Sequence, residues 1–414
     1  MSYSPKINKL ILLFLLAAVL RLFFVFGYPQ IPVESDALDY DRLGSSLAQG
    51  KGFITEEGDL EMGRSPGFPF FLAVIYKIFG HTYKHVKFFQ ILISLITLGI
   101  IFCLARDVFG ERVGFIAMFV GAIYPPFLSY NGLILSECLF TFCIVLFVYL
   151  SLLSIRRRDW LASFLAGLVG GFAFFVRQEF ILFLPSLFIL GYIYFKEDLK
   201  KIVLLILVAL VIITPWIIRN SKAFDKFVCI PSQVSGIFWI STYEEEWLEW
   251  HSEDPYFRNL TKGSAGFEKD NLLLRESIKN IKEHPFLYTK FCFKRLVRFW
   301  IGSHSNTFYG LQESFTNYVS NKDYLRVAIK TSLLIFNTLL TFFGFCGIIM
   351  AIRKIRERRK EVVLLVMPIS VIMIIHFFLF ATLRYQVPIM PLMIIFASYI
   401  IASFWDQKQK NIAF

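Results

Sequence analysis

The sequence IPVESDALDYDRLGSSLAQGKGF, residues 31–53, directly follows an apolar run that is long enough to cross a membrane. It places Glu34, Asp36, Asp39 and Asp41 within eight positions of a chain in which 18% of the residues are charged. A carboxylate beside hydrocarbon is unfavourable unless it faces water, a cavity or a partner of opposite charge. This acidic cluster therefore indicates either a solvated loop or a functional site at the membrane surface.

Apolar blocks of similar length recur along the whole chain. Of its 414 residues, 56% are hydrophobic, which exceeds the roughly 45–50% of an average soluble protein. An α-helix is the open-chain element that satisfies its own backbone hydrogen bonds in lipid. We therefore predict an all-α polytopic membrane protein, a single domain over residues 1–414 with about ten transmembrane helices. The predicted spans are 8–27, 86–105, 113–129, 138–154, 161–176, 180–195, 202–218, 327–352, 362–380 and 387–405.

The positions of the basic residues, which give the chain its net charge of +12, are typical of a membrane protein. Basic clusters such as 156–158 and 353–360 lie in short loops between apolar blocks, as the positive-inside rule describes for cytoplasmic loops. This assignment puts both termini in the cytoplasm and two long segments, 28–85 and 219–326, outside the cell membrane. The longer segment carries near-equal numbers of both signs. The charge pattern thus indicates a lipid bilayer as the partner and argues against nucleic acid.

Helical periodicity predicts amphipathic helices in both outer segments. In the first, a spacing of four residues puts Asp36 and Tyr40 on one face, with Asp39 pointing elsewhere. In the second, residues 278–300 combine apolar and basic positions and are interrupted at Pro285. We expect these helices to lie along the membrane interface.

One glutamate and four arginines are predicted at the same outer face of the membrane. Glu137 lies in YNGLILSECLF, where the third predicted span ends and the fourth begins. The arginines are Arg64 in GRSPGFP, Arg177 in FFVRQEF, Arg219 in TPWIIRN and Arg384 in LRYQVP. Guanidinium groups match phosphate oxygens well. A carboxylate base combined with such arginines indicates a substrate that carries a phosphate at bilayer level.

Other chemistries lack their usual sequence signals. The chain has no P-loop, dinucleotide fingerprint, zinc-protease motif or nucleophile elbow. Its six cysteines lack metal-finger spacing. We predict no metal site and no cofactor, with a divalent cation left as an alternative that the sequence does not support. The Asp39-Tyr40-Asp41 triplet has the form of a metal-binding D-x-D, but it lies on the predicted surface helix. His376 is interpreted as a proton relay or an interior histidine, and Arg21 as snorkelling to an interface or paired inside the bundle.

The order of these motifs resembles that of a known family. SDALDYDRLGSSLAQGKGF followed by RSPGFPFFLAVIYKIFG is similar to the first outer loop of the GT-C membrane glycosyltransferases. The likeness continues through LILSECLF, GGFAFFVRQEFILFLP, TPWIIRNSKAFDKFV, HPFLYTKFCFKRLVRFW and RYQVPIMPLMII, and so covers essentially the whole chain. More narrowly, the chain resembles the bacterial glycosyltransferase family 39/83 group, which includes protein O-mannosyltransferases and the aminoarabinose transferase that modifies lipid A.

The resemblance implies the GT-C fold and an inverting glycosyltransferase. Its donor would be a polyprenyl-phosphate-linked sugar, and its acceptor would be a protein, a lipid or another glycan on the extracytoplasmic face. By motif position, Asp36 is the implied catalytic residue and Glu137 the second acidic position. Tyr40, Tyr385 and the four arginines are the expected substrate-binding residues.

The sequence departs from the relatives' pattern in two places. Asp36 is followed by Ala37, where the protein mannosyltransferases carry an acidic pair. Arg64 and Ser65 precede Pro66, where the aminoarabinose transferase has a glutamate. A metal site like that enzyme's is therefore not expected.

Two other classes of function stay open at this point. A transporter or flippase of a lipid-linked or amphipathic anion would place charges at mid-membrane and broken helices in two related halves. The candidate groups instead lie at one face, and the sequence has no internal repeat. A catalytically silent protein of the same fold, acting as an assembly partner, would carry the same residues.

Overall fold

The structure, a computed structural model, describes residues 5–61, 63–227, 233–243, 260–262 and 266–412. These residues form helices and loops, and the β structure among them is an isolated antiparallel bridge between Ile54 and Leu60. The longer helices are α1 (Pro5–Leu22), α4 (Tyr83–Phe109), α7 (Glu137–Arg156), α8 (Trp160–Val176), α10 (Leu199–Phe224), α13 (Gly266–Glu283), α14 (Pro285–Trp300), α16 (Tyr324–Lys354), α17 (Arg359–Phe378) and α18 (Met390–Ile412). The shorter ones are α2 (Asp36–Ala48), α3 (Gly67–Phe79), α5 (Glu111–Ile123), α6 (Pro125–Ser129), α9 (Phe183–Tyr194), α11 (Gln233–Tyr243) and α15 (Phe315–Ser320). The predicted all-α class is confirmed.

Seven helices in the described part of the chain are long and apolar enough to cross a membrane. They are Lys6–Gly27, Tyr83–Phe109, Glu137–Arg156, Lys196–Phe224, Tyr324–Lys354, Arg359–Phe378 and Leu383–Trp405. The pair Glu111–Ile123 and Pro125–Gly132, bent by 60°, makes an eighth if it is one span. The predicted spans 161–176 and 180–195 fold as shorter apolar helices. The ten predicted ranges thus coincide with helices, but seven or eight of them meet the length and hydropathy of a full span.

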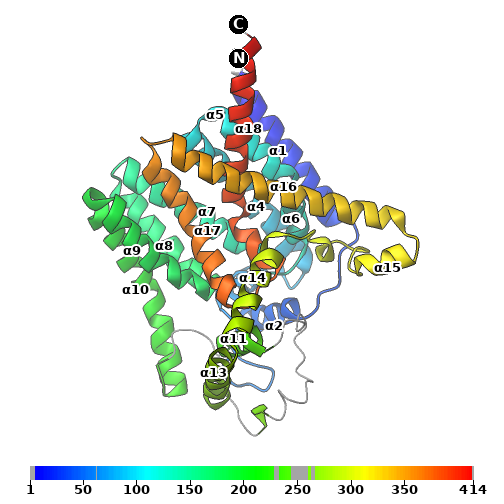
Figure 1. Cartoon of the computed structure of the whole chain (residues 1–414). Coiled ribbons are helices and arrows are strands. Elements are labelled where there is room, and N and C mark those ends of the chain that lie inside the picture. The colour runs from blue at the N-terminus through cyan, green and yellow to red at the C-terminus, as the bar shows by residue number, and fades with distance from the viewer. Residues whose placement is uncertain (1–4, 62, 228–232, 244–259, 263–265, 413–414) are drawn as a thin grey trace.

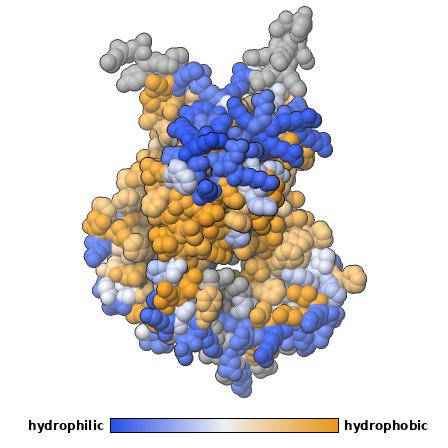
Figure 2. Space-filling model, turned by 90° about the vertical axis from the view of Figure 1, so that its left-hand side faces the viewer, coloured by the Kyte–Doolittle hydropathy of each residue, from blue (hydrophilic) through white to orange (hydrophobic). Residues whose placement is uncertain are grey.

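The surface has the banded character of an integral membrane protein. Figure 2 shows a broad apolar belt between hydrophilic zones at the two ends of the molecule. Large exposed side chains such as Leu12, Val211 and Phe342 belong to the candidate spans. Such a belt matches the hydrocarbon layer of a bilayer, where apolar side chains face outward.

The basic loops gather at one end of the helix bundle. Arg358 donates to the carbonyl of Val108 at 2.8 Å, and Arg156 pairs with Glu361 at 3.4 Å. These contacts join the α4–α5, α7–α8 and α16–α17 junctions. Figure 1 places both termini at this end, opposite α2, α11 and α13. This arrangement agrees with the predicted alternation of helix directions, while the compartment that each end faces stays a prediction.

A buried arginine donates to the backbone carbonyls that lose their helical donors at the break between α5 and α6. Pro125 and Pro126 have no backbone N–H, so the carbonyls of Gly121 and Ala122, four residues earlier, lose their helical donors. Arg21 of α1 donates to both carbonyls, at 3.4 and 3.3 Å, and to a serine hydroxyl of α4 at 2.8 Å. The Arg21 side chain is fully buried. Of its two interpretations, pairing inside the bundle is confirmed and snorkelling is wrong.

The first outer segment reaches the bundle through a close glycine contact. A Cβ on Gly67, at the start of α3, would lie 2.6 Å from the backbone nitrogen of Val176 at the end of α8. Glycine therefore lets α3 begin directly against the α8 backbone. This contact sets the loop that carries Arg64 beside the residue that follows α8, Arg177.

The second outer segment contributes α11, α13, α14 and α15, and part of 219–326 lies outside the described residues. As predicted, the helix over 278–300 is broken before Pro285, which begins α14. Arg295 of α14 donates to the Ser241 carbonyl of α11 at 2.7 Å, so the two helices are tied together. Their location at the membrane interface stays a prediction, as does the division of the chain into outer segments.

Candidate active site

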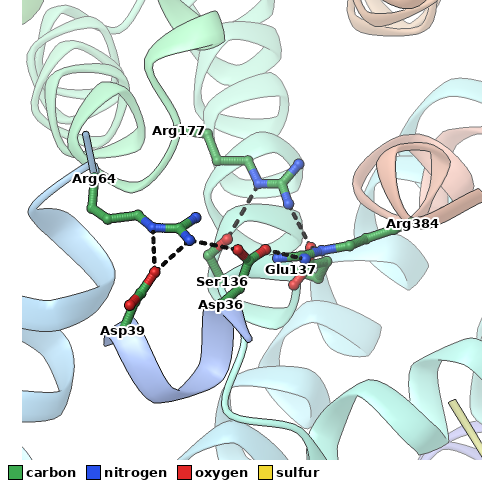
Figure 3. Close-up of polar contacts among 7 residues, drawn as sticks. All are labelled: Asp36, Asp39, Arg64, Ser136, Glu137, Arg177 and Arg384. Carbon is green, nitrogen blue, oxygen red and sulfur yellow. Dashed lines mark hydrogen bonds and ion pairs between the residues drawn. The ribbon is translucent and has the colours of Figure 1, made fainter. Parts of the chain in front are cut away.

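Asp36 is the first residue of α2 and follows a strained backbone position. Ser35 has φ 52° and ψ −125°, a combination that residues other than glycine rarely adopt. The Ser35 carbonyl accepts from the N–H groups of Leu38 and Asp39, at 3.0 and 3.3 Å, which anchors the first turn of α2. Strain of this kind persists where the surrounding structure holds it, often at functional sites. It presents the Asp36 carboxylate to the arginines shown in Figure 3.

Arg64 joins Asp36 to Asp39 (Figure 3). Its Nη2 lies 2.7 Å from Asp36 Oδ1 and 2.6 Å from Asp39 Oδ2. Its guanidinium also lies 5.7 Å from the centre of the Tyr40 ring, which is buried against Phe68. The prediction that Asp39 points away from the Asp36 site is wrong, because residues three apart on a helix are also neighbours and Arg64 contacts both carboxylates.

Arg384 links Asp36 to Glu137. It belongs to the 3₁₀ segment Leu383–Ile389 that precedes α18, and its Nη1 lies 2.5 Å from Asp36 Oδ2. Its Nε donates to Glu137 Oε1. Arg177, at the end of α8, donates to the same glutamate oxygen at 2.5 Å and to Ser136 Oγ at 3.2 Å. Residues far apart in the sequence thus form one continuous ionic cluster (Figure 3).

The two acidic residues predicted to be catalytic differ in access. Glu137 begins α7, has no exposed surface, and holds two arginines on one oxygen. Its Oε2 has no hydrogen-bond partner among the described residues. The Asp36 side chain is 33% exposed. Glu137 therefore anchors Arg177 and Arg384 inside the protein, whereas the Asp36 carboxylate is accessible from outside.

The arginines decide the charge of Asp36. Burial raises the pKa of this carboxyl, but Arg384 and Arg64 together lower it more, so the pKa lies below the usual value for aspartate. For Arg64, burial lowers the pKa and the nearby Asp36 raises it, with a net rise. Asp36 is thus ionised and Arg64 charged at neutral pH.

An aromatic stack supports the arginines from the side of α14. The Tyr385 ring lies 4.3 Å from the His376 ring, nearly parallel to it, and Arg177 lies 5.3 Å from the Tyr385 ring centre. His376 stacks in turn on Phe299 of α14 at 5.6 Å, and its Nδ1 lies 2.9 Å from the Phe380 carbonyl. These contacts favour the interpretation of His376 as a packed interior histidine.

Two cavities meet at Asp36 and Arg384. The larger has a volume of about 1300 Å³ and the smaller about 480 Å³. Both are lined by Ile31, Ser35, Asp36, Leu133, Leu135, Asn306, Gln312 and Arg384. The larger one alone is also lined by Arg64, Tyr385, Ser303, His304, Ser305 and Thr307. The Asp36 carboxylate is therefore accessible from two spaces.

The structure does not bring every predicted residue to this site. Arg219, on α10, is not among the described residues that line either cavity. Its guanidinium donates to Asn220 at 2.8 Å and lies 4.9 Å from the Trp216 ring centre. Sequence reasoning missed Ser136, which binds Arg177, and Glu179, which lies 3.6 Å from Arg177. Both are close neighbours of residues that were predicted, and that closeness was the available signal.

The D-x-D triplet is divided between two structural roles. Asp39 pairs with Arg64, whereas Asp41 accepts from the hydroxyls of Tyr76 and Tyr83 at 2.6 and 2.9 Å and lies 2.8 Å from His81 Nε2. Asp41 thus fastens α2 to α3 and α4. In the part of the chain that the structure covers, no three His, Cys, Asp or Glu side chains gather as a metal site.

Comparison with known sequences gives two matches. Residues 63–218 match the family model described as dolichyl-phosphate-mannose-protein mannosyltransferase. An uncharacterized protein of Aquifex aeolicus is 27% identical over 188 residues, which is 42% of this chain and 37% of that protein. The matched family segment includes Arg64, Glu137 and Arg177.

Comparison with solved structures extends the likeness to nearly the whole chain. The oligosaccharyltransferase AglB from Archaeoglobus fulgidus, in complex with an inhibitory peptide and a dolichol-phosphate, superposes with a TM-score of 0.61 at 16% identity. The match covers 100% of this chain and 52% of AglB. ArnT from Cupriavidus metallidurans, bound to undecaprenyl phosphate, gives a TM-score of 0.57 at 15% identity, over 94% of this chain and 59% of ArnT. This chain thus spans about half the length of AglB.

Proposed function

We propose that this chain, which has the fold of the GT-C membrane glycosyltransferases, is itself an inverting glycosyltransferase. It would move a sugar from a polyprenyl-phosphate-linked donor to an acceptor on the extracytoplasmic face of the membrane. The observation that carries this proposal is an ionised, accessible aspartate at the junction of two cavities, held by two arginines suited to a phosphate. The dolichol-phosphate in AglB and the undecaprenyl phosphate in ArnT support a lipid-linked donor.

In the proposed reaction, Asp36 takes a proton from the acceptor hydroxyl or amine. The acceptor atom forms a bond to the anomeric carbon of the sugar while the bond from that carbon to the phosphate oxygen breaks. The polyprenyl phosphate keeps the bonding electron pair and leaves as an anion. Because this leaving group is stable when ionised, one carboxylate base suffices and no general acid is needed.

The arginines also control how strong a base Asp36 is before and after the donor binds. In the unliganded site Arg384 and Arg64 hold the pKa of Asp36 low, which makes it a weak base. A donor phosphate offers the same two guanidinium groups a second anion. As they turn to the phosphate, Asp36 loses part of its charge stabilisation and its pKa rises. Donor binding would thus activate the base when there is a sugar to transfer.

Glu137 and Arg177 have a supporting role in this mechanism. Glu137 is buried and holds both Arg177 and Arg384, so it keeps the Arg384 guanidinium beside Asp36. Once the donor phosphate is bound, an arginine held in this way stabilises the charge that develops on the leaving phosphate. Asp36 is favoured over Glu137 as the base because it lines both cavities and Glu137 lines neither of them.

The test is mass spectrometry of envelope glycans and glycolipids from matched strains. These are a deletion strain and deletion strains complemented with the natural chain, with Asp36→Asn, or with Asp59→Asn. Asp59 lies in the same outer segment but is exposed, so the second variant controls for loss of an outer carboxylate. The proposal requires one sugar to disappear on deletion, to stay absent with Asp36→Asn, and to return with Asp59→Asn. Restoration by Asp36→Asn would rule out Asp36 as the base, and unchanged glycans in every strain would contradict the transferase.

A further inference from the structure

A second group of arginines lies at the α16–α17 junction, at the end of the bundle where the basic loops gather. Residues 353–360, RKIRERRK, contain six basic side chains and one acidic side chain. Arg353, Arg356 and Arg359, together with Ile352, line a cavity of about 650 Å³. Three guanidinium groups around one cavity repel one another unless an anion lies between them.

These three side chains differ from the other arginines at this end. Among the described residues, no hydrogen bond or ion pair engages the guanidinium groups of Arg353, Arg356 and Arg359. By contrast, Arg358 donates to backbone carbonyls at the end of α4, and Arg158 pairs with Glu197 at 2.8 Å. Backbone contacts therefore engage Arg358 and an exposed ion pair engages Arg158, whereas such contacts among the described residues do not engage the arginines of the cavity.

The surface of α16 beneath this cavity is apolar and exposed. Ile335, Leu339, Phe342 and Ile349 are 52%, 49%, 57% and 52% exposed, and their spacing of three, four and seven residues puts them on one face of the helix. The same spacing, continued by four residues from Ile349, reaches Arg353. An apolar stripe that ends at guanidinium groups matches a lipid, with acyl chains along the stripe and a headgroup among the arginines.

We propose that Arg353, Arg356 and Arg359 form a binding site for the phosphate of an anionic lipid headgroup, at the membrane face opposite Asp36. The guanidinium groups supply paired donors to the phosphate oxygens. The apolar stripe of α16 distinguishes a lipid from a soluble phosphate, which would gain nothing from it. This site is separate from the proposed transferase chemistry, so either can hold without the other.

Native mass spectrometry of the full chain tests the site, with phosphatidylglycerol and phosphatidylcholine as probes. The natural chain is expected to retain phosphatidylglycerol in preference to phosphatidylcholine. The triple variant Arg353→Gln, Arg356→Gln, Arg359→Gln is expected to bind phosphatidylglycerol on the order of 100-fold more weakly. A matched variant, Arg157→Gln, Lys354→Gln, Lys360→Gln, removes the same charge from exposed positions that do not line the cavity, and is expected to keep the preference.

Three results would overturn the proposal. Equal loss in both variants would mean that diffuse charge, not this cavity, attracts the lipid. If neither variant retained less phosphatidylglycerol than the natural chain, the site would be ruled out. If inorganic phosphate at the same concentration were retained as well as phosphatidylglycerol, the site would be assigned to a soluble anion. If the glutamine variant does not fold, the triple Arg→Lys variant replaces it. That variant keeps the charge but loses the planar donor pairs, so it should bind with intermediate affinity.

Discussion

Two arginine sites in this protein, one fully buried and one partly exposed, show opposite uses of the same side chain. Arg21 donates to backbone carbonyls that two prolines have left without donors, and its side chain is fully buried. Arg384 pairs with the carboxylates of Asp36 and Glu137 and lines two cavities. Backbone carbonyls are neutral and fixed, so Arg21 has no alternative partner and serves the fold. Arg384 can exchange Asp36 for another anion that enters a cavity, which is what a binding site needs.

The largest effect is expected from Asp36→Asn, which keeps the shape of the side chain but removes its basicity. Positioned proton transfer contributes roughly 10²–10⁴-fold, so the transfer rate per folded molecule should fall by about that factor. The melting temperature should change little, because Asp36 is partly exposed and Glu137 still holds Arg384. Initial-rate measurements on purified protein decide this, and a rate near that of the natural chain would contradict the assignment.

Arg21→Leu should have the opposite effect: it should lower the stability of the protein and leave the transfer rate per folded molecule unchanged. The substitution leaves the Gly121 and Ala122 carbonyls buried without donors, and each unsatisfied group costs about 1–3 kcal/mol. Unfolding in matched detergent should therefore show a loss of about 2–6 kcal/mol for the two carbonyls together. Transfer per folded molecule should stay normal. Reduced transfer at an unchanged melting temperature would mean that Arg21 also serves the active site.

The pH dependence of the reaction should report the arginines around Asp36. Because its pKa in the folded protein is depressed, the Asp36–Arg384 pair contributes stability above the unfolded pKa of about 3.9 and loses it as pH falls through the lower folded value. The acid limb of kcat/KM should accordingly lie below about pH 4. In Arg384→Gln, which removes one of the two lowering charges, the limb should move up by about one pH unit. An unmoved limb would show that a different group titrates.

The smallest effect is expected at the strained turn before α2. Ser35→Gly relieves a backbone conformation that disfavours a side chain, and should stabilise the fold by less than about 1 kcal/mol, since glycine also gains freedom when unfolded. Ser35→Ala removes the hydroxyl but keeps the strain, and is the matched control. Thermal unfolding of both variants measures the difference. A gain with alanine as large as with glycine would show that the strain is not the cause.

Part of this architecture follows from the sequence, because hydropathy and helical period are local properties. The long apolar blocks predict the candidate spans, and Glu137 stands out as a charge in an apolar context that needs a partner. Counting apolar blocks overestimates the number of transmembrane helices, because hydropathy does not distinguish a 17-residue apolar helix such as α8 from a helix that crosses the whole membrane.

The site is less accessible to such reasoning, because contacts between distant segments depend on side-chain reach and helix packing. Asp36 and Asp39, three residues apart on α2, are neighbours on the helix surface, and Arg64 contacts both. Arg219 and Arg384 occupy similar places in the sequence, each at the end of an apolar block. The structure brings Arg384 to the site, whereas Arg219 lies beside Trp216.

The most direct measurement is the affinity of polyprenyl phosphate for the natural chain and for Asp36→Asn, at neutral pH in the same detergent. If Asp36 and the donor phosphate share Arg64 and Arg384, removing the carboxylate charge frees the arginines and removes a repulsion. The variant should then bind polyprenyl phosphate about tenfold more tightly, the equivalent of roughly 1.4 kcal/mol, while failing to transfer sugar. Weaker or unchanged binding would contradict an exchange of anions at these arginines.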